Sequence, residues 1–180
     1  KALLTKIESY KCENVSIYLN AQTVDGFTPL HISCQKNFNH YTYEIISFLY
    51  ENDRNNISSY LNIQTNDALT PLHFACNNNN KVMVDLLIQF PDSINPNLYN
   101  FQEETPLLIA ASHDEKLIVK RLLRLPQLNV NSPFIRSNKT PLFIACEHWN
   151  MKIFNLLFND LRIDINCQLS GSKITPLMNS

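Results

Sequence analysis

The sequence predicts an all-α protein built as a solenoid of stacked helix-turn-helix units. The first observation is the tripeptide Thr-Pro-Leu, which begins at Thr28, Thr70, Thr105, Thr140 and Thr175. Successive copies lie 42 residues apart once and then 35 residues apart three times, and a fixed period in this range is typical of stacked repeats. The second observation is that a short apolar segment follows each of the first four copies. Because a solenoid works through an extended surface, this architecture favours binding over catalysis.

Each Thr-Pro pair is predicted to start a first helix. Threonine is a favourable N-cap because its hydroxyl accepts a backbone N–H of the first turn. Proline suits the first helical position, where its missing N–H costs nothing and its φ is preset. The apolar residues of these first helices lie at 30–34, 72–76, 107–111 and 142–146.

A polar turn and a second helix are predicted to complete each unit. Apolar residues recur at helical spacing in these second helices, for example at Leu117, Ile118 and Leu122. Asparagine is expected at left-handed turn positions, including the run 77–80, because the chain has only two glycines. An apolar residue followed by asparagine closes each unit: Leu19-Asn20, Leu61-Asn62, Ile94-Asn95, Val130-Asn131 and Ile165-Asn166.

The repeated pattern resembles the ankyrin repeat, whose signature includes T-P-L-H-x-A and a period near 33 residues. Residues 70–75 match that signature in full, and residues 28–33 depart from it only at Ser33. The third and fourth copies replace its histidine with Leu108 and Phe143. The resemblance implies two antiparallel helices per repeat and a loop or β-hairpin that projects at about a right angle. It also implies that the first helices and hairpins line a concave face, with the second helices on the convex face.

We expect one ankyrin-repeat domain over residues 1–180, with incomplete repeats at both ends. Ile45, Ile46 and Leu49 align with apolar residues near the N-terminus when the sequence is shifted by 42 residues, so the first residues are interpreted as a second helix without its first. The expected units are a partial repeat 1–22, four repeats 23–64, 65–99, 100–134 and 135–169, and a partial repeat 170–180. The sequence is therefore interpreted as a piece of a longer array, or as an array whose neighbouring residues are disordered.

Composition excludes several classes of partner. The chain has 15 basic and 16 acidic side chains and a net charge of −1, which gives no reason to expect nucleic acid or a membrane surface as partner. No apolar run approaches the ~18 residues of a membrane span. Three of the five cysteines (Cys34, Cys76 and Cys146) share one register in the first helices, where a small buried residue is expected. Cys12 and Cys167 are expected in loops, and the whole set favours a reducing, cytoplasmic location.

The sequence offers weak candidates for chemistry, and we expect no catalytic residue, metal, cofactor or small-molecule substrate. His31 and His73 are interpreted as structural, because the resemblance implies that this histidine hydrogen-bonds around the Thr-Pro turn. His113 and His148 are expected side by side at the ends of adjacent first helices, with Glu147 as the only further metal ligand in view. A basic stripe of Lys116, Lys120, Arg121 and Arg124 is interpreted as a solvated face, with a phosphate or acidic-tail site as the alternative.

The resemblance places partner contacts on the hairpin tips and on the exposed positions of the first helices. Counted from each threonine, these positions are Val24, Asp25, Phe27, Gln35 and Lys36; Asn66, Asp67, Leu69, Asn77 and Asn78; Phe101, Gln102, Glu104, Ser112 and His113; and Arg136, Ser137, Lys139, Glu147 and His148. Trp149 follows at a turn position that the family normally gives to glycine, as a contact anchor or as a cover for the C-terminal edge. Acids lead in the first repeats and bases in the fourth, which indicates a partner of mixed charge.

Three functions are compatible with this surface. The favoured one is a non-catalytic, monomeric module that binds another protein through the concave face. The alternative is the recognition domain of a larger protein, such as an enzyme, a ubiquitin-ligase adaptor or a channel, whose activity lies outside this chain. A third is an architectural role in which the open ends of the array stack between molecules.

Overall fold

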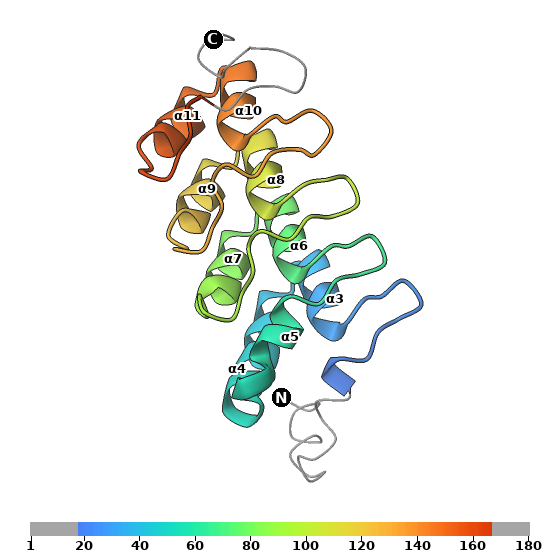
Figure 1. Ribbon diagram of the computed structural model, residues 1–180. Coiled ribbons are helices and arrows are strands. Elements are labelled where there is room, and N and C mark those ends of the chain that lie inside the picture. The colour runs from blue at the N-terminus through green and yellow to red at the C-terminus, as the bar shows by residue number, and fades with distance from the viewer. Residues whose placement is uncertain (1–17, 167–180) are drawn as a thin grey trace.

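The computed structural model describes residues 18–166, and within them the predicted all-α solenoid is confirmed. These residues form nine α-helices, one short 3₁₀ helix and no strand. Most of the α-helices stand in two parallel rows, from which loops project to one side (Figure 1). The first row comprises α3 (Pro29–Gln35), α6 (Pro71–Asn77), α8 (Pro106–Ser112) and α10 (Pro141–Glu147). The second row comprises α4 (Asn39–Asn52), α7 (Lys81–Ile88), α9 (Lys116–Leu122) and α11 (Met151–Phe158).

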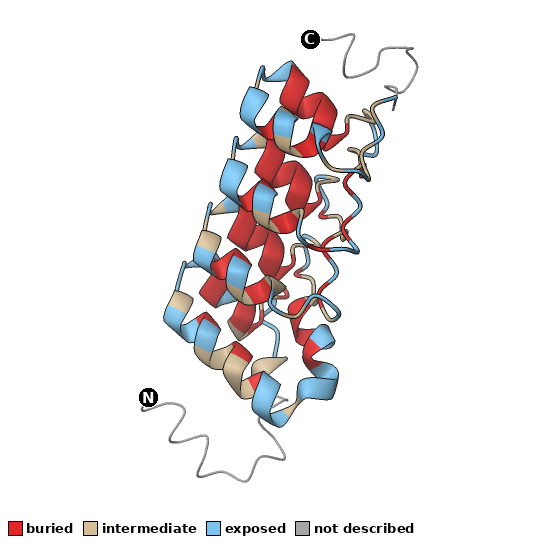
Figure 2. Ribbon diagram, turned by 90° about the vertical axis from the view of Figure 1, so that its left-hand side faces the viewer, coloured by how far each residue is buried: buried red, intermediate tan, exposed pale blue. Residues whose placement is uncertain are grey.

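The core is a column that runs the length of both rows. Each first-row helix packs against its second-row partner and against the next helix of its own row. Figure 2 shows the buried residues continuing from one helix pair to the next, with exposed residues on the outer ends. Leu72 and Leu107 of the first row and Leu87 and Leu122 of the second are almost inaccessible to solvent. Each such leucine contributes about 1.5–3 kcal/mol through burial, so the repeats stabilise one another rather than folding around separate cores.

The predicted threonine caps are confirmed at all four described Thr-Pro positions. The hydroxyl oxygens of Thr28, Thr70, Thr105 and Thr140 each accept the backbone N–H three residues later, at 3.3 to 3.4 Å. A proline follows each cap at the start of the helix. The four threonines are buried, so each helix start is fixed by a local bond that also lies inside the stack.

Left-handed backbone recurs at two positions in each repeat. One lies nine residues after the threonine, in the turn between the two helices: Asn37, Asn79, Asp114 and Trp149, with φ from 50° to 59°. The other lies two residues before it, in the projecting loop: Gly26, Ala68, Glu103 and Asn138, with φ from 55° to 81°. Asparagine takes three of the eight positions, as expected, and glycine only one. At Ala68, Glu103 and Trp149 the residue has a Cβ but neither the asparagine nor the aspartate side chain that eases this backbone, so these positions carry its steric cost.

The 42-residue spacing is explained by a larger second half of the first repeat. Helix α4 has 14 residues, whereas α7, α9 and α11 have seven or eight. It is followed by the 3₁₀ helix η2 (Arg54–Asn56) and by α5 (Ile57–Leu61), which have no counterpart in the other described repeats. Burial of Ile57, Tyr60 and Leu61 attaches α5 to the core. The extra residues therefore build additional surface beside α4 and leave the turn register unchanged.

A ladder of asparagine side chains joins consecutive repeats. The side chains of Asn62, Asn97 and Asn131 each donate an N–H to a backbone carbonyl of the following repeat, at 2.7 to 2.8 Å. The side-chain oxygen of each asparagine also accepts a backbone N–H from that following repeat. The closing asparagine of the second repeat is thus Asn97, and the assignment of Ile94-Asn95 to that place was wrong. Pro96 stands before Asn97 where Leu61 and Val130 precede the other two asparagines, so the pattern of an apolar residue followed by asparagine selected Ile94-Asn95 instead.

Cys34, Cys76 and Cys146 are buried thiols, as expected. Burial raises the pKa of the Cys34 thiol to about 12 and also raises that of Cys76, so both remain protonated. Cys12 and Cys167, most of the partial repeat 1–22 and all of 170–180 lie outside the described residues. No helix in the described part of the chain combines the length and apolarity needed to cross a bilayer.

Candidate functional site

The first three projecting loops share one backbone geometry. Each is closed by a bond between the residues five and one before the threonine, such as Thr23 N–H to Phe27 O at 2.9 Å. Neighbouring tips are joined by a single backbone bond. Asn66 N–H donates to Asp25 O at 3.0 Å, and Phe101 N–H donates to Asp67 O at 3.1 Å. These bonds hold the tips in a continuous row along one edge of the array.

The fourth loop is one residue longer than the others. Its closing bond runs from Phe134 N–H to Lys139 O at 3.0 Å and encloses one more residue. Arg136 N–H donates to the Glu103 carboxylate at 2.9 Å instead of to a backbone carbonyl. The residue that occupies the tip position of Val24 and Phe101 is therefore Ile135, which sequence reasoning missed by counting back from Thr140. The signal was the nine-residue distance from Asn131 to Thr140, against eight from Asn62 to Thr70.

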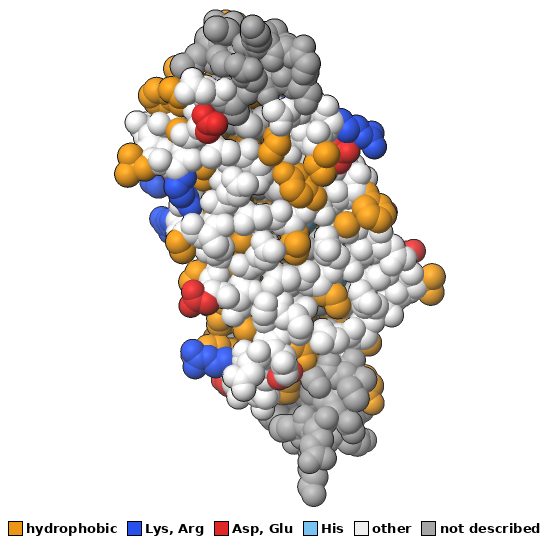
Figure 3. All heavy atoms as spheres, viewed as in Figure 1, with side chains coloured by type: hydrophobic (Ala, Val, Ile, Leu, Met, Phe, Trp, Pro, Cys, Tyr) orange, Lys and Arg blue, Asp and Glu red, His pale blue; other side chains and the backbone are white. Residues whose placement is uncertain are grey.

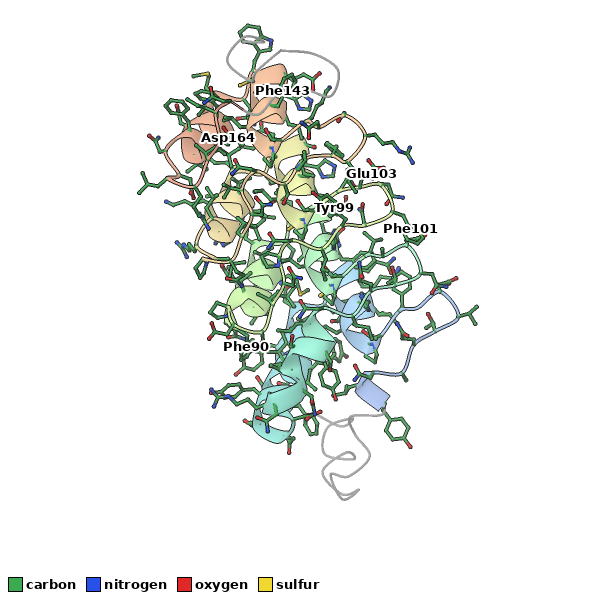
Figure 4. All side chains as sticks on the ribbon, viewed as in Figure 1. Phe90, Tyr99, Phe101, Glu103, Phe143 and Asp164 are labelled. Atoms are coloured by element: carbon green, nitrogen blue, oxygen red, sulfur yellow. The ribbon has the colours of Figure 1, made fainter. Side chains whose placement is uncertain are left out.

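Three of the four tips carry an exposed apolar side chain. The exposed fractions are 96% for Val24, 69% for Phe101 and 63% for Ile135, and the second tip has the exposed polar residue Asn66. Figure 4 shows Phe101 reaching out from its loop, and Figure 3 shows apolar side chains at the outer edge of the loops. A hydrophobic side chain held at the end of a loop contributes nothing to the core, so this row needs another explanation.

The charges on this face are mixed and partly paired. Arg136 forms an ion pair with Glu103 across two repeats at 2.9 Å. Lys139 pairs with Glu147 of α10 at 2.7 Å and lies 5.9 Å from the centroid of the Phe143 ring. Pairs this exposed contribute about 1 kcal/mol or less to stability. Because the Lys139–Glu147 pair joins a loop to the end of a first-row helix, the two elements belong to one surface. We call this surface, formed by the loop tips and the ends of α3, α6, α8 and α10, the loop-tip face.

Several residues of the predicted surface also support the fold. Phe27 is half-buried, and its ring lies 5.5 Å from that of Phe74. Leu69 is half-buried against the core. The side chain of Asn78 donates to the carbonyls of Cys34 and Gln35 in the preceding repeat, at 3.1 and 3.0 Å.

Two further predicted positions are engaged within the loops. The Asn66 side chain donates to Val24 O at 2.9 Å, and the Glu104 carboxylate accepts the side-chain N–H of Asn100 at 3.1 Å. Glu104 is half-buried, whereas Asn66 is exposed. These contacts fix the loops, so the residues are less accessible to a partner than their register alone suggests.

The other predicted positions lie on the surface. Exposed residues are Asp25, Gln35, Lys36, Asp67, Asn77, Gln102, His113 and His148, while Ser112 and Ser137 are half-buried. His113 and His148 are the C-cap residues of α8 and α10, which pack together. No group of three or more potential metal ligands occurs among residues 18–166. Trp149 is 74% exposed in its left-handed turn.

The basic stripe on α9 is only partly free. Arg121 forms an ion pair with Asp85 of α7 at 2.7 Å, which ties two second-row helices together. Lys116, Lys120 and Arg124 are exposed, as expected for a solvated face.

His31 and His73 are buried and hold the repeats together. Nδ1 of His31 accepts the Thr28 N–H at 3.1 Å, which places the proton on Nε2, and Nε2 lies 3.1 Å from the carbonyls of Ile63 and Leu69. His73 makes the same local bond to Thr70, and its Nε2 lies 3.1 Å from Glu104 O in the next repeat. Burial lowers the pKa of each imidazole to about 4. Both rings are therefore neutral structural groups at pH 7.

Comparison with protein families gives one match that spans nearly the whole chain. A family model described as ankyrin repeats (3 copies) matches residues 1–100, 56–132 and 92–169. A search of curated proteins found no match. The family match agrees with the paired helices, the capped Thr-Pro starts and the projecting loops.

Proposed function

This chain belongs to the ankyrin repeat family, and we propose that it is a non-catalytic module that binds a partner protein through the loop-tip face. Ankyrin repeats generally mediate protein–protein interactions, and the family match carries no catalytic domain. The proposal goes further, because it names the surface. The repeat boundaries expected from the sequence are part of it, since the face is built by combining one loop and one helix end from each unit.

The observation that carries the proposal is the row of exposed apolar tips. Val24, Phe101 and Ile135 project from loops that are joined in a row, the first three by backbone bonds and the fourth by the bond from Arg136 N–H to the Glu103 carboxylate. Phe101 is of the aromatic type that is enriched at protein interfaces, and Val24 and Ile135 extend the exposed apolar row on the same support. Trp149 extends the same kind of contact to the turn after α10, because tryptophan is among the residues most enriched at interface hot spots.

The charged residues supply orientation rather than most of the affinity. Asp25 and Asp67 are exposed at the first two tips, whereas Arg136 and Lys139 lie in the fourth loop. This distribution fits a partner with its own mixed charges, because complementary potentials act mainly on specificity and association rate. Reversal of Arg136 and Lys139 to glutamate should weaken binding and change its salt dependence. Unchanged affinity and salt dependence would contradict the charge assignment.

The test compares two variants that each change three exposed apolar residues to serine. One is Val24→Ser with Phe101→Ser and Ile135→Ser, on the loop tips. The matched control is Val82→Ser with Leu117→Ser and Phe158→Ser, which are exposed on the second row. Proteins captured from the source cell by the wild type should be lost with the first variant and kept with the second. Capture that is identical for both variants, or lost only with the control, would contradict the proposal. Circular dichroism and the melting temperature establish that both variants are folded.

A further inference from the structure

A cavity lies on the second-row side of the molecule, between the enlarged first repeat and the second repeat. Its volume is about 710 Å³, and it is lined by residues of α4, η2, the start of α5 and the segment 89–93 after α7. Figure 4 shows Phe90 on the opposite side of the molecule from Phe101. The cavity is therefore separate from the loop-tip face, and an inference about it does not rest on that face being the binding surface.

The asparagine ladder shows which residues occupy the position of Ser93 where the second repeat meets the third and where the third meets the fourth. The carbonyls that accept from Asn62, Asn97 and Asn131 belong to Ser93, Gln127 and Arg162 respectively, so these three residues occupy one structural position. At each of the later two junctions, the long side chain at this position reaches back into the preceding repeat.

Both long side chains bond backbone carbonyls of the preceding repeat, and they share one carbonyl position, Ile94 for Gln127 and Leu128, at 3.4 Å, for Arg162. Gln127 donates to the carbonyl oxygens of Pro91 and Ile94. The guanidinium of Arg162 donates to the carbonyl oxygens of Leu123 and Leu125, at 2.8 and 2.7 Å. The planar amide of Gln127 and the planar guanidinium of Arg162 thus occupy the space between successive repeats, from the second repeat to the fourth. Ser93 is too short to do the same, and the cavity lies at its junction.

The cavity also has the chemistry to hold a cation. The rings of Tyr50 and Phe90 lie in contact, with centroids 5.5 Å apart, and Tyr43 adds a third ring to the lining. Arg54 lies 4.7 Å from the Tyr50 centroid, which shows that this wall accepts a guanidinium against a ring. Glu51 and Asp92 contribute two carboxylates against the one positive charge of Arg54, so the lining is net negative.

We propose that this cavity is a second interaction site and that it takes an arginine side chain from a partner protein. The incoming guanidinium occupies the place that Arg162 fills from within the chain at the last described junction. Its positive charge faces Glu51 and Asp92, and its planar group stacks on the aromatic wall. A lysine fits less well, because a point charge lacks the fork of donors and the flat face.

The test uses the peptide acetyl-Gly-Arg-Gly-amide and the full chain labelled with ¹⁵N. Amide shifts should change only in residues 43–57 and 89–93 as the peptide is raised to about 10 mM, a range suited to a single side-chain contact. The same peptide with citrulline, which keeps the shape and loses the charge, should bind about fivefold more weakly. A lysine peptide should also bind more weakly. No shift changes, changes scattered over other surfaces, or equal binding of the arginine and citrulline peptides would overturn the proposal.

Two variants place the site. Ser93→Arg supplies the side chain that stands at Arg162, and it should fill the cavity and abolish the peptide response. Leu161→Arg adds the same charge at a fully exposed residue outside both the cavity lining and the loop-tip face, and it should leave the response unchanged. Asp92→Asn should weaken peptide binding about fivefold through loss of one carboxylate. If Ser93→Arg loses its amide dispersion and is unfolded, Asp92→Asn decides the question, and an unaltered affinity there would count against the site.

Discussion

The third helical residue is a histidine in α3 and α6, whereas α8 and α10 have Leu108 and Phe143 at the same place. All four side chains are buried, and all four helices have the same threonine cap. In the first pair, the imidazole adds a bond to the cap residue and reaches a backbone carbonyl of the next repeat. In α8 and α10, apolar contacts take the place of these hydrogen bonds, and Leu108 belongs to the main core cluster. The comparison shows that the third helical position accepts either a histidine or an apolar side chain, provided that the buried imidazole stays neutral.

The largest expected effect is a decrease in the free energy of unfolding at acidic pH, which we attribute to His31 and His73. The pKa of each imidazole is about 4 in the folded chain, against about 6.5 for a histidine exposed to water, so the unfolded state binds more protons between these values. Stability therefore falls as the pH is lowered from about 6.5 to 4, by about 3 kcal/mol per histidine, and the contribution is constant above and below that window. Urea unfolding at a series of pH values measures it.

The control for this prediction comes from the second pair. His31→Leu combined with His73→Leu should remove most of the loss between pH 6.5 and 4, because leucine serves at the equivalent position in α8. An equal decrease in the free energy of unfolding for the wild type and the double variant would assign the acid sensitivity to carboxylates instead.

The next largest effect is the loss of stability caused by a cavity at the position of Leu108. Leu108→Ala removes a fully buried side chain and should destabilise the chain by about 3 kcal/mol. The loss should be the same at pH 7 and pH 4.5, because no titrating group is involved. Denaturant unfolding at the two pH values provides the measurement, and a cost that changes with pH would break the distinction between the two pairs.

A smaller effect is expected when a histidine replaces the leucine at this position of the third repeat. The cap residue Thr105 has nearly the same φ and ψ as Thr70, so Leu108→His should place its ring as His73 does and reach toward the carbonyl of Lys139. At pH 7 the free energy of unfolding should change by about 1 kcal/mol or less, since new hydrogen bonds offset lost apolar burial. Between pH 6.5 and 4 the variant should lose about 2 kcal/mol more than the wild type. A variant without added pH dependence would show that the histidine site needs more than the local turn.

The smallest effect concerns the turns, which differ between the same two pairs. The left-handed position is Asn37 or Asn79 in the first pair and Asp114 or Trp149 in the second. Trp149→Gly should stabilise the chain by about 1 kcal/mol, because glycine has no Cβ to clash at φ of 54°. The melting temperature should rise by about 2–4 °C. Asn79→Gly is the matched control and should gain less, because asparagine tolerates this backbone better than tryptophan. Equal gains, or a loss at Trp149, would mean that the indole ring contributes to stability.

Local sequence was sufficient to predict the parts of the structure that depend on neighbours in the chain. The capped Thr-Pro starts and the left-handed turn at Asn79 follow from interactions across at most nine residues. The structural role of His31 and His73 followed from the family resemblance, and their bonds to the next repeat were visible only in the structure. The family resemblance, counted from each threonine, predicted which residues lie in the loops and at the ends of the first helices, and their contact with a partner stays a prediction. The count failed in the fourth loop, where one extra residue puts Ile135 at the tip.

The sequence by itself determined the repeat, the order of its two main helices and the residues that start each first helix, because these rest on short-range sterics and hydrogen bonds. Only the tertiary structure decided how one repeat meets the next. The Asn62–Asn97–Asn131 ladder, the Arg136–Glu103 pair and the cavity beside Ser93 each join residues about 30 or more positions apart or lie between two repeats. Such contacts depend on the stacking of whole helices, and a shift of one residue in a loop changes which side chains meet.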